Sequence, residues 1–264
     1  MKLHIILFLI LAPLSPLFSQ GAEEKGLEIA IANEKANDGF VGESSEMEMV
    51  LEDAHGTKIK RKMKGKIMET TGDGDKSISQ FLLPADVKGT MMLTWTHKKK
   101  DDDQWLFLPS IKRTKRISSS NKSASFMGSE FSYEDLGSQE VEKYTHKLLK
   151  EEKNKEGLDL WVMERVPRNK KSGYKKLKVW IIKKYSNPEK IEYYDRKNEL
   201  LKVATFSSFK EFKIGSRTLY RASKIHMVNV QTGKKSTIRW SNRSLGVKFE
   251  EEDFEKDSLL DQDF

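Results

Sequence analysis

Residue types that usually carry out catalysis are sparse in this chain of 264 residues. Glu134 and Asp135 form an adjacent acidic pair that could act as general acid and base, although a lone pair in a turn more often caps a turn or pairs with a cation. There is no cysteine, no nucleophile elbow and no phosphate-binding loop. The histidines beyond residue 22 are scattered without metal-ligand spacing: His55, His97, His146 and His226. We therefore expect a protein that is not an enzyme and needs no cofactor or metal.

Methionine and aromatic residues recur at alternate positions in the first half of the chain. Methionine fills irregular space and adapts to ligands of varied shape, which suits a pocket for flexible acyl chains. For any single residue, a place in an ordinary packed core is the commoner outcome. As a set, eight residues are predicted to line a hydrophobic ligand-binding cavity: Met47, Met49, Met63, Met91, Leu93, Trp95, Trp105 and Phe107.

Two arginines and an acidic-aromatic turn flank a polar loop, residues 118–123, that follows this stretch. The guanidinium groups of Arg113 and Arg116 could hold a lipid phosphate, because their fork geometry suits phosphate and carboxylate alike. Tyr133, Glu134 and Asp135 could latch a lid. Alternatively, the arginines and the carboxylates pair with each other and pin the loop between them. We predict headgroup or lid contacts for these five residues and leave the alternative open.

The N-terminal segment has the layout of a secretory signal peptide. Lys2 precedes an apolar run over residues 5–12, and small or polar residues follow at 19–22. The run is shorter than the roughly 20 residues that span a bilayer, so a membrane anchor is the weaker alternative. Cleavage within residues 19–22 would leave a single domain over residues 23–264 in the periplasm. The net charge of +8 favours anionic partners, and export makes nucleic acid the least expected of these.

Alternation of apolar and polar residues, typical of half-buried strands, dominates the chain after residue 46. We expect about ten antiparallel strands joined by short turns, such as the turn at residues 72–75. Helical spacing and alanines predict one helix over residues 23–37, and shorter helices are possible at 84–88 and 133–136. The tail over residues 250–264 is helix-like or irregular.

A lysine ladder marks one predicted strand, residues 57–67. Lysine occupies every second position there, from Lys58 to Lys66, opposite a mostly apolar face. Such a row is usually the solvated face of a strand, but it could also contact anionic headgroups or lipopolysaccharide. Binding through lysines would weaken as ionic strength rises.

The stretch from Trp105 to Leu136 reads W-x-F-L-P-x-x-x-R-x-x-R-I and then G-S-E-F-S-Y-E-D-L. It resembles the LolA-like outer-membrane lipoprotein-sorting proteins, in a branch with a GSDFSYEDL-type signature. Glu130 stands here where an aspartate is common in that branch, which keeps the charge. The resemblance implies a single antiparallel sheet curled into an incomplete barrel, with short helices covering its concave side.

The same resemblance implies a periplasmic carrier for lipids or lipidated proteins, which shields acyl chains during transfer towards the outer membrane. Its expected partners are lipid or lipoprotein acyl chains, an inner-membrane exporter of the RND type, and a membrane in transient contact. The alternative is a non-catalytic envelope adaptor that binds anionic polymer or lipopolysaccharide through the lysine ladder. Acyl chains that co-purify with the protein would favour the carrier.

Overall fold

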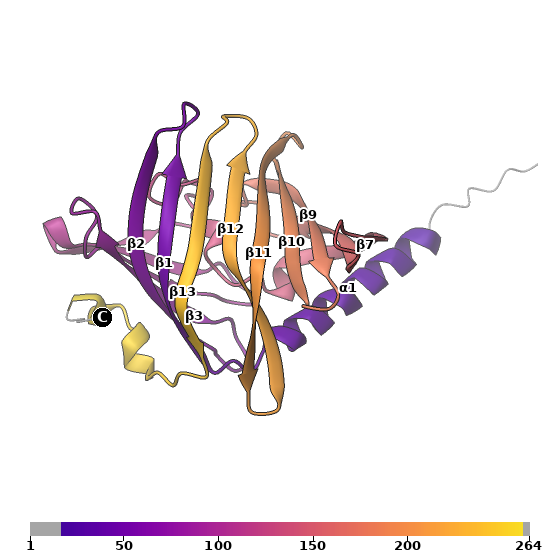
Figure 1. Cartoon of the computed structure of the whole chain (residues 1–264), viewed down its shortest axis with the longest axis horizontal. Coiled ribbons are helices and arrows are strands. Elements are labelled where there is room, and N and C mark those ends of the chain that lie inside the picture. The colour runs from indigo at the N-terminus through magenta and orange to yellow at the C-terminus, as the bar shows by residue number, and fades with distance from the viewer. Residues whose placement is uncertain (1–16, 261–264) are drawn as a thin grey trace, which may run out of the picture.

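A computed structural model describes residues 17–260 of the chain (Figure 1). One large antiparallel sheet curves around a concave side, and one long helix lies against it. Residues 1–16 of the predicted signal peptide lie outside the described residues, and residues 17–22 form the start of the helix. Among residues 17–260, no helix is both long enough and apolar enough to cross a bilayer.

The sheet contains thirteen strands in two meanders. The first meander runs through β1 (Gly42–Glu52), β2 (Lys58–Met68), β3 (Lys76–Leu83), β4 (Met91–Trp95), β5 (Asp103–Leu108) and β6 (Arg113–Ile117). The second runs through β7 (Tyr144–Lys153), β8 (Asp159–Pro167), β9 (Tyr174–Ile182), β10 (Asn187–Asp195), β11 (Leu200–Ile214), β12 (Arg217–Asn229) and β13 (Lys235–Leu245).

The two meanders join because the first strand pairs with the last, β1 with β13. The sheet therefore ends at β6 on one side and at β7 on the other, and it is not closed into a barrel. The predicted fold class, one large antiparallel sheet forming an incomplete barrel, is confirmed. The structure has more strands than expected. The additional ones, β6 and β7, are edge strands, and their charged, exposed residues give only a weak alternation of apolar and polar positions.

The helix, α1 (Leu17–Asn37), contains the predicted segment 23–37 and lies on edge strand β7. Gly26 permits this approach, since a Cβ atom there would lie 2.7 Å from the backbone of Lys147. Ile29 and Ala30 are buried on the same side. At the other end, the Asn37 amide donates to the carbonyl of Ser186 at 2.7 Å. The helix therefore bridges from the sheet edge to the turn between β9 and β10.

The predicted short helix at residues 84–88 is wrong. That segment is a turn between β3 and β4, closed by a hydrogen bond from the amide of Val87 to the carbonyl of Pro84 at 3.2 Å. The other predicted cap is a single 3-10 turn, η2 (Tyr133–Asp135), and another, η3 (Val141–Lys143), precedes β7. Both belong to the segment over residues 118–143, called here the crossing segment because it links the two edge strands β6 and β7.

Apolar residues are buried on both faces of the sheet. The larger cluster lies on the concave side and includes Phe126 and Phe131 from the crossing segment. A second cluster lies on the convex side of β3, β4 and β5, where Phe254 and Leu259 of the C-terminal tail cover it. The tail forms the 3-10 turns η4 (Glu251–Phe254) and η5 (Asp257–Leu260), and residues 261–264 lie outside the described part.

The contact between α1 and β7 can be tested with a buried and an exposed position of the same helix. Gly26→Ala should lower the free energy of unfolding by about 1–3 kcal/mol, because the new methyl group meets backbone rather than a movable side chain. Glu24→Ala changes an exposed residue of α1 and should stay within about 0.5 kcal/mol. Urea denaturation measures both, and equal effects would contradict the close approach.

Candidate functional site

A cavity of about 710 Å³ lies between α1, the crossing segment and the concave face of the sheet. Its apolar wall comes mainly from β10, β11 and β12 and from the crossing segment: Phe131, Val141, Ile191, Tyr193, Ala204, Phe206, Ile225 and Met227. Its volume falls within the range of about 300–1,000 Å³ that small-molecule pockets occupy. We call this space the roofed cavity, because α1 and the crossing segment form its roof.

The crossing segment itself fills another part of the concave side. Phe126 is fully buried with its ring 5.8 Å from that of Phe81 on β3. A guanidinium nitrogen of Arg61 donates to the carbonyl of Met127. The concave side above β2 and β3 is therefore occupied by protein, while the region under α1 keeps open space.

The eight predicted cavity residues are divided between the two faces of the sheet. Met49 and Met63 are buried in the concave cluster, and Met47 packs against it. The other five belong to the convex cluster under the C-terminal tail: Met91, Leu93, Trp95, Trp105 and Phe107. None of the eight lines the roofed cavity. The expectation that they share one surface is wrong.

The physical reason is that β4 is buried on both faces. Met91 to Thr94 are all buried, so alternation gives no indication of which residues face inward. Met92 belongs to the concave cluster, whereas Leu93 lies on the convex side. Neighbouring residues of a strand point to opposite faces. Choosing odd instead of even positions as inward-facing therefore assigns every residue of the strand to the opposite face. The Trp95 indole donates to the carbonyl of Phe254 at 2.7 Å, which ties the convex set to the tail.

The predicted headgroup and lid residues do not pair with each other. Arg113 is exposed on edge strand β6, and Arg116 pairs with Asp103 of β5. Tyr133 packs against the concave cluster. Both arginines therefore lie at the sheet edge, away from the carboxylates of the crossing segment, and the expectation that the two charged groups pin the loop by pairing is wrong.

Asp135 anchors the crossing segment through a buried ion pair with Lys202 of β11. The carboxylate lies 2.6 Å from the Lys202 ammonium, and both side chains are at most 6% exposed. The amide of Ser132 donates to the same carboxylate oxygen, Oδ2, at 2.7 Å. The Tyr174 hydroxyl donates to the other oxygen, Oδ1, at 2.8 Å. Lys202 also donates to the carbonyl of Glu130 at 2.8 Å. Such a network stabilises only because each of its members has a partner.

Glu134 holds the same segment to the turn between β8 and β9. Its carboxylate accepts from the Ser172 hydroxyl and from the amide of Gly173, each at 2.9 Å. Burial raises the pKa of Glu134 above its ordinary value, while these donors act against the shift. Glu134 therefore ties the crossing segment to the second meander, and its role as a lid latch stays a prediction.

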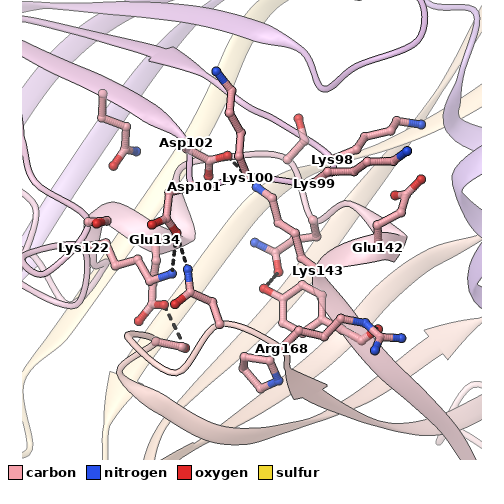
Figure 2. A pocket seen from close by; sticks show the side chains of 18 of the residues that line it. Lys98, Lys99, Lys100, Asp101, Asp102, Lys122, Glu134, Glu142, Lys143 and Arg168 are labelled. Carbon is pink, nitrogen blue, oxygen red and sulfur yellow. Dashed lines mark hydrogen bonds and ion pairs between the residues drawn. The ribbon is translucent and has the colours of Figure 1, made fainter.

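Side chains of the turn between β4 and β5 contact η3 and the turn between β8 and β9 (Figure 2). Lys143 pairs with Asp102 at 2.6 Å, and Asn169 donates to Asp101. Around these contacts is a second pocket of about 470 Å³ with lysines from the β4–β5 turn and Arg168 on its walls. We call it the seam pocket. Its acidic and basic groups are interleaved, and several of them pair with one another.

Carboxylates line the end of the roofed cavity nearest α1. Burial, with Asp75 and Glu34 nearby, raises the pKa of Glu140 to about 7. Burial also raises the pKa of Asp75 to about 6. Lys98 lies 3.9 Å from Glu140 and 3.8 Å from Glu34 and offsets part of their charge. This end of the cavity therefore changes its charge near neutral pH.

Sequence reasoning missed the residues of β8 and β10–β12 that form the roofed cavity. Arg165 has the same parity as Trp161 and Met163 of the concave cluster, but Leu160 and Val162 are apolar as well, so the sequence of β8 did not show which parity faces the concavity. For Ala204 and Ile225 no signal distinguishes a cavity wall from an ordinary core. Open space remains in the roofed cavity because of where α1 and the crossing segment lie.

The open half-barrel with a roofed concave side defines a LolA-like fold, and comparison with known proteins agrees. A lipoprotein-sorting domain from Vibrio parahaemolyticus is 45% identical with a TM-score of 0.86, covering 90% of this chain and 99% of that one. A DUF1329 family protein from Desulfovibrio piger is 29% identical with a TM-score of 0.83 over the same shares. A LolA superfamily protein from Nitrosomonas europaea shares the fold at 20% identity and a TM-score of 0.68, covering 88% and 98%.

The family model that matches residues 73–261 is described only as an uncharacterized protein. A comparison with curated proteins gives no match. At 45% identity over 99% of the Vibrio domain, this chain belongs to the family of that outer-membrane lipoprotein-sorting domain.

Removing one member of the buried ion pair should destabilise the fold. Lys202→Met leaves Asp135 buried and uncompensated, so we expect a loss of about 3–5 kcal/mol in the free energy of unfolding, with faster amide exchange in residues 118–143. Lys202→Met combined with Asp135→Asn should recover part of that loss. Lys210→Met, an exposed change on the same strand, should stay within about 0.5 kcal/mol. An effect of Lys202→Met no larger than that of the control would contradict the anchoring role.

The raised pKa of Glu140 predicts a pH-dependent stability. Between about pH 4.5 and 7 the folded protein keeps a proton that the unfolded chain releases, so this group's contribution to stability falls as pH rises through that window. Glu140→Gln should therefore gain about 1–3 kcal/mol relative to the native protein between pH 5 and pH 8. Denaturation at both pH values measures the gain, and Glu142→Gln, an exposed neighbour, should show none.

Proposed function

We propose that this protein is a periplasmic carrier for lipids or lipidated proteins, with an acyl chain sheltered in the roofed cavity. The observation that carries the proposal is a cavity of about 710 Å³, with an apolar wall on β10–β12, that the fold leaves open beneath α1 and the crossing segment. Membership of a lipoprotein-sorting family supports the same function. In this proposal the signal peptide, residues 1–22, is removed on export and residues 23–264 form the carrier.

The magnitude of chain burial sets what such a carrier can do. Each buried methylene contributes about 0.8 kcal/mol, so a chain of about 16 carbons would contribute roughly 12 kcal/mol before ordering costs. A bilayer offers the chain a similar stabilisation. Net transfer therefore requires a carrier whose affinity differs between two states or partners. We include an inner-membrane RND-type exporter as the donor, as the family resemblance implies.

The roof supplies an element whose movement could provide the two states. The crossing segment is attached to the second meander through Asp135 and Glu134, and to the first through Arg61 and Gln104. Gln104 donates to the carbonyl of Tyr133 at 2.9 Å. Release of the contacts on one side would open the cavity without unfolding the sheet.

The adaptor alternative has less support, because the lysine ladder is largely matched by acidic residues. In the register of β1 with β2, Glu52, Glu48 and Glu46 lie opposite Lys58, Lys62 and Lys64. Lys58 lies 3.4 Å from Glu52, and Lys66 lies 3.6 Å from Asp253 of the tail. This surface therefore presents mixed charge to a polyanion.

Two measurements test the carrier. The protein purified without detergent should carry lipid that mass spectrometry detects, and the delipidated protein should bind hexadecanol and hexadecanoate. Ile225→Trp places a large ring in the cavity wall and should weaken binding of both ligands at least about 10-fold, because it removes the space for several methylenes.

Lys224→Trp is the matched control, since the adjacent residue of β12 points to the opposite face of the sheet. It should leave binding unchanged. Denaturation curves of both variants establish that they are folded. Unchanged binding by a folded Ile225→Trp variant, or no binding by the native protein, would disprove the proposed cavity.

A further inference from the structure

The polar atoms that lack partners are concentrated on the wall of the roofed cavity. Among residues 17–260, seven side-chain nitrogen or oxygen atoms are buried without a hydrogen bond. Five of these belong to residues that line the cavity: Asn33, Glu34, Thr70, His146 and Arg165. Buried polar groups are nearly always paired in folded proteins. A wall that combines such atoms with apolar side chains suits a ligand with both a hydrocarbon chain and a polar headgroup.

Arg165 is the most costly of these groups to leave without a partner. It lies on β8 between His146 of β7 and Leu177 of β9, on the concave face. Its Nε atom is buried without an acceptor, and no hydrogen bond or ion pair of its guanidinium is found with any residue from 17 to 260. A guanidinium is always charged at physiological pH and loses hydration when it is buried.

Other arginines on this face are paired. Arg243 lies 2.9 Å from the Glu43 carboxylate, and Arg221 lies 3.8 Å from it and donates to Asn37 at 2.8 Å. Arg61 donates to the carbonyl of Met127. Arg61 has no carboxylate partner either, but Arg165 differs from all three because its guanidinium has neither a hydrogen bond nor an ion pair among residues 17–260.

The groups around Arg165 do not supply an anion. Burial lowers its pKa, and the groups that oppose this shift are the phenols of Tyr144 and Tyr193, which are neutral at physiological pH. Burial lowers the pKa of His146 to about 4, so this histidine is neutral, and its Nε2 lies 2.9 Å from the carbonyl of Val141.

Several carboxylates on the cavity wall have cations of their own. Asp135 pairs with Lys202, while Glu34 and Glu140 share Lys98. None of these carboxylates contacts the Arg165 guanidinium.

We propose that Arg165 binds the anionic headgroup of a lipid whose chain occupies the apolar part of the roofed cavity. The inference rests on the proposed carrier function and adds the class of cargo: an amphiphile with a carboxylate or phosphate next to a long hydrocarbon chain. The headgroup oxygen atoms accept from the guanidinium, while Ile191, Ala204 and Met227 contact the chain. The orphan Nδ1 of the neutral His146 lies beside Arg165 and can accept a hydrogen bond from a hydroxyl group of the same lipid.

The experiment compares ligands that share one chain length and differ in the headgroup. Isothermal titration calorimetry of the delipidated protein uses hexadecanoate, hexadecyl phosphate and neutral hexadecanol. A charge-assisted hydrogen bond in a desolvated site predicts that the two anions bind about 10- to 100-fold more tightly than the alcohol. The ratio between the two anions then identifies a fatty acid or a phosphate headgroup as the better ligand.

Substitutions assign the preference to one side chain. Arg165→Gln should reduce the preference for anions to about 3-fold or less while hexadecanol binding is unchanged, and Arg165→Lys should restore part of it. Arg239→Gln, on the exposed convex face beside Glu48, is the control and should change nothing. Denaturation midpoints confirm that each variant is folded.

Each failure has a separate meaning. Equal binding of the three ligands to the native protein would overturn the role of Arg165 and leave the carrier intact. A preference for anions that survives in Arg165→Gln would also overturn it, and so would inorganic phosphate binding as tightly as hexadecyl phosphate. Absence of binding by all three ligands would overturn the carrier proposal itself.

Discussion

The buried pair of Asp135 and Lys202 is the interaction on which the architecture of the concave side depends. An open sheet with one apolar face must be covered, and here the chain that covers it also connects the two sheet edges. With Lys202 at 2.6 Å and donors from Tyr174 and Ser132, the carboxylate is fully compensated in a buried position. The pair therefore fixes the position of the crossing segment over the second meander, and the position of this segment decides which part of the hollow is filled and which stays open.

The same covering arrangement explains why the sheet has two apolar faces at β4. The crossing segment packs on the concave side, while Phe254 and Leu259 of the tail pack on the convex side. The Trp95 and Trp105 rings, 4.9 Å apart in an edge-to-face arrangement, belong to this second layer. Aromatic residues that looked like a ligand pocket are therefore the seat of the C-terminal tail. The part of the concave side beneath α1, on β10–β12, keeps open space of the size that a carrier needs.

Charge is distributed differently on the two sides of the sheet. On the convex face, lysines of β2 lie opposite glutamates of β1 in exposed pairs that contribute little to stability. Within the concavity, charged residues line part of the cavity wall, and several of them form buried ion pairs. Glu43, Asp135 and Glu140 all have nearby cations, whereas Arg165 has no partner among the described residues. That difference favours an amphiphile with an anionic headgroup over a purely apolar chain.

Period-two alternation over short strands was sufficient to predict one large antiparallel sheet, and the alanine-rich segment before it predicted α1, because these features depend on local side-chain spacing. The motif around Glu134 and Asp135 marked the segment that holds the roof. Its partners could not be predicted, since Lys202 and Gly173 are distant in sequence and only the pairing of β1 with β13 brings the second meander around. Likewise, Met92 and Leu93 are equally apolar, so only the layers packed above and below β4 decided which one faces the concavity. The sequence by itself determined the sheet and the helix, and the tertiary structure decided where the hollow lies and which charge remains inside it.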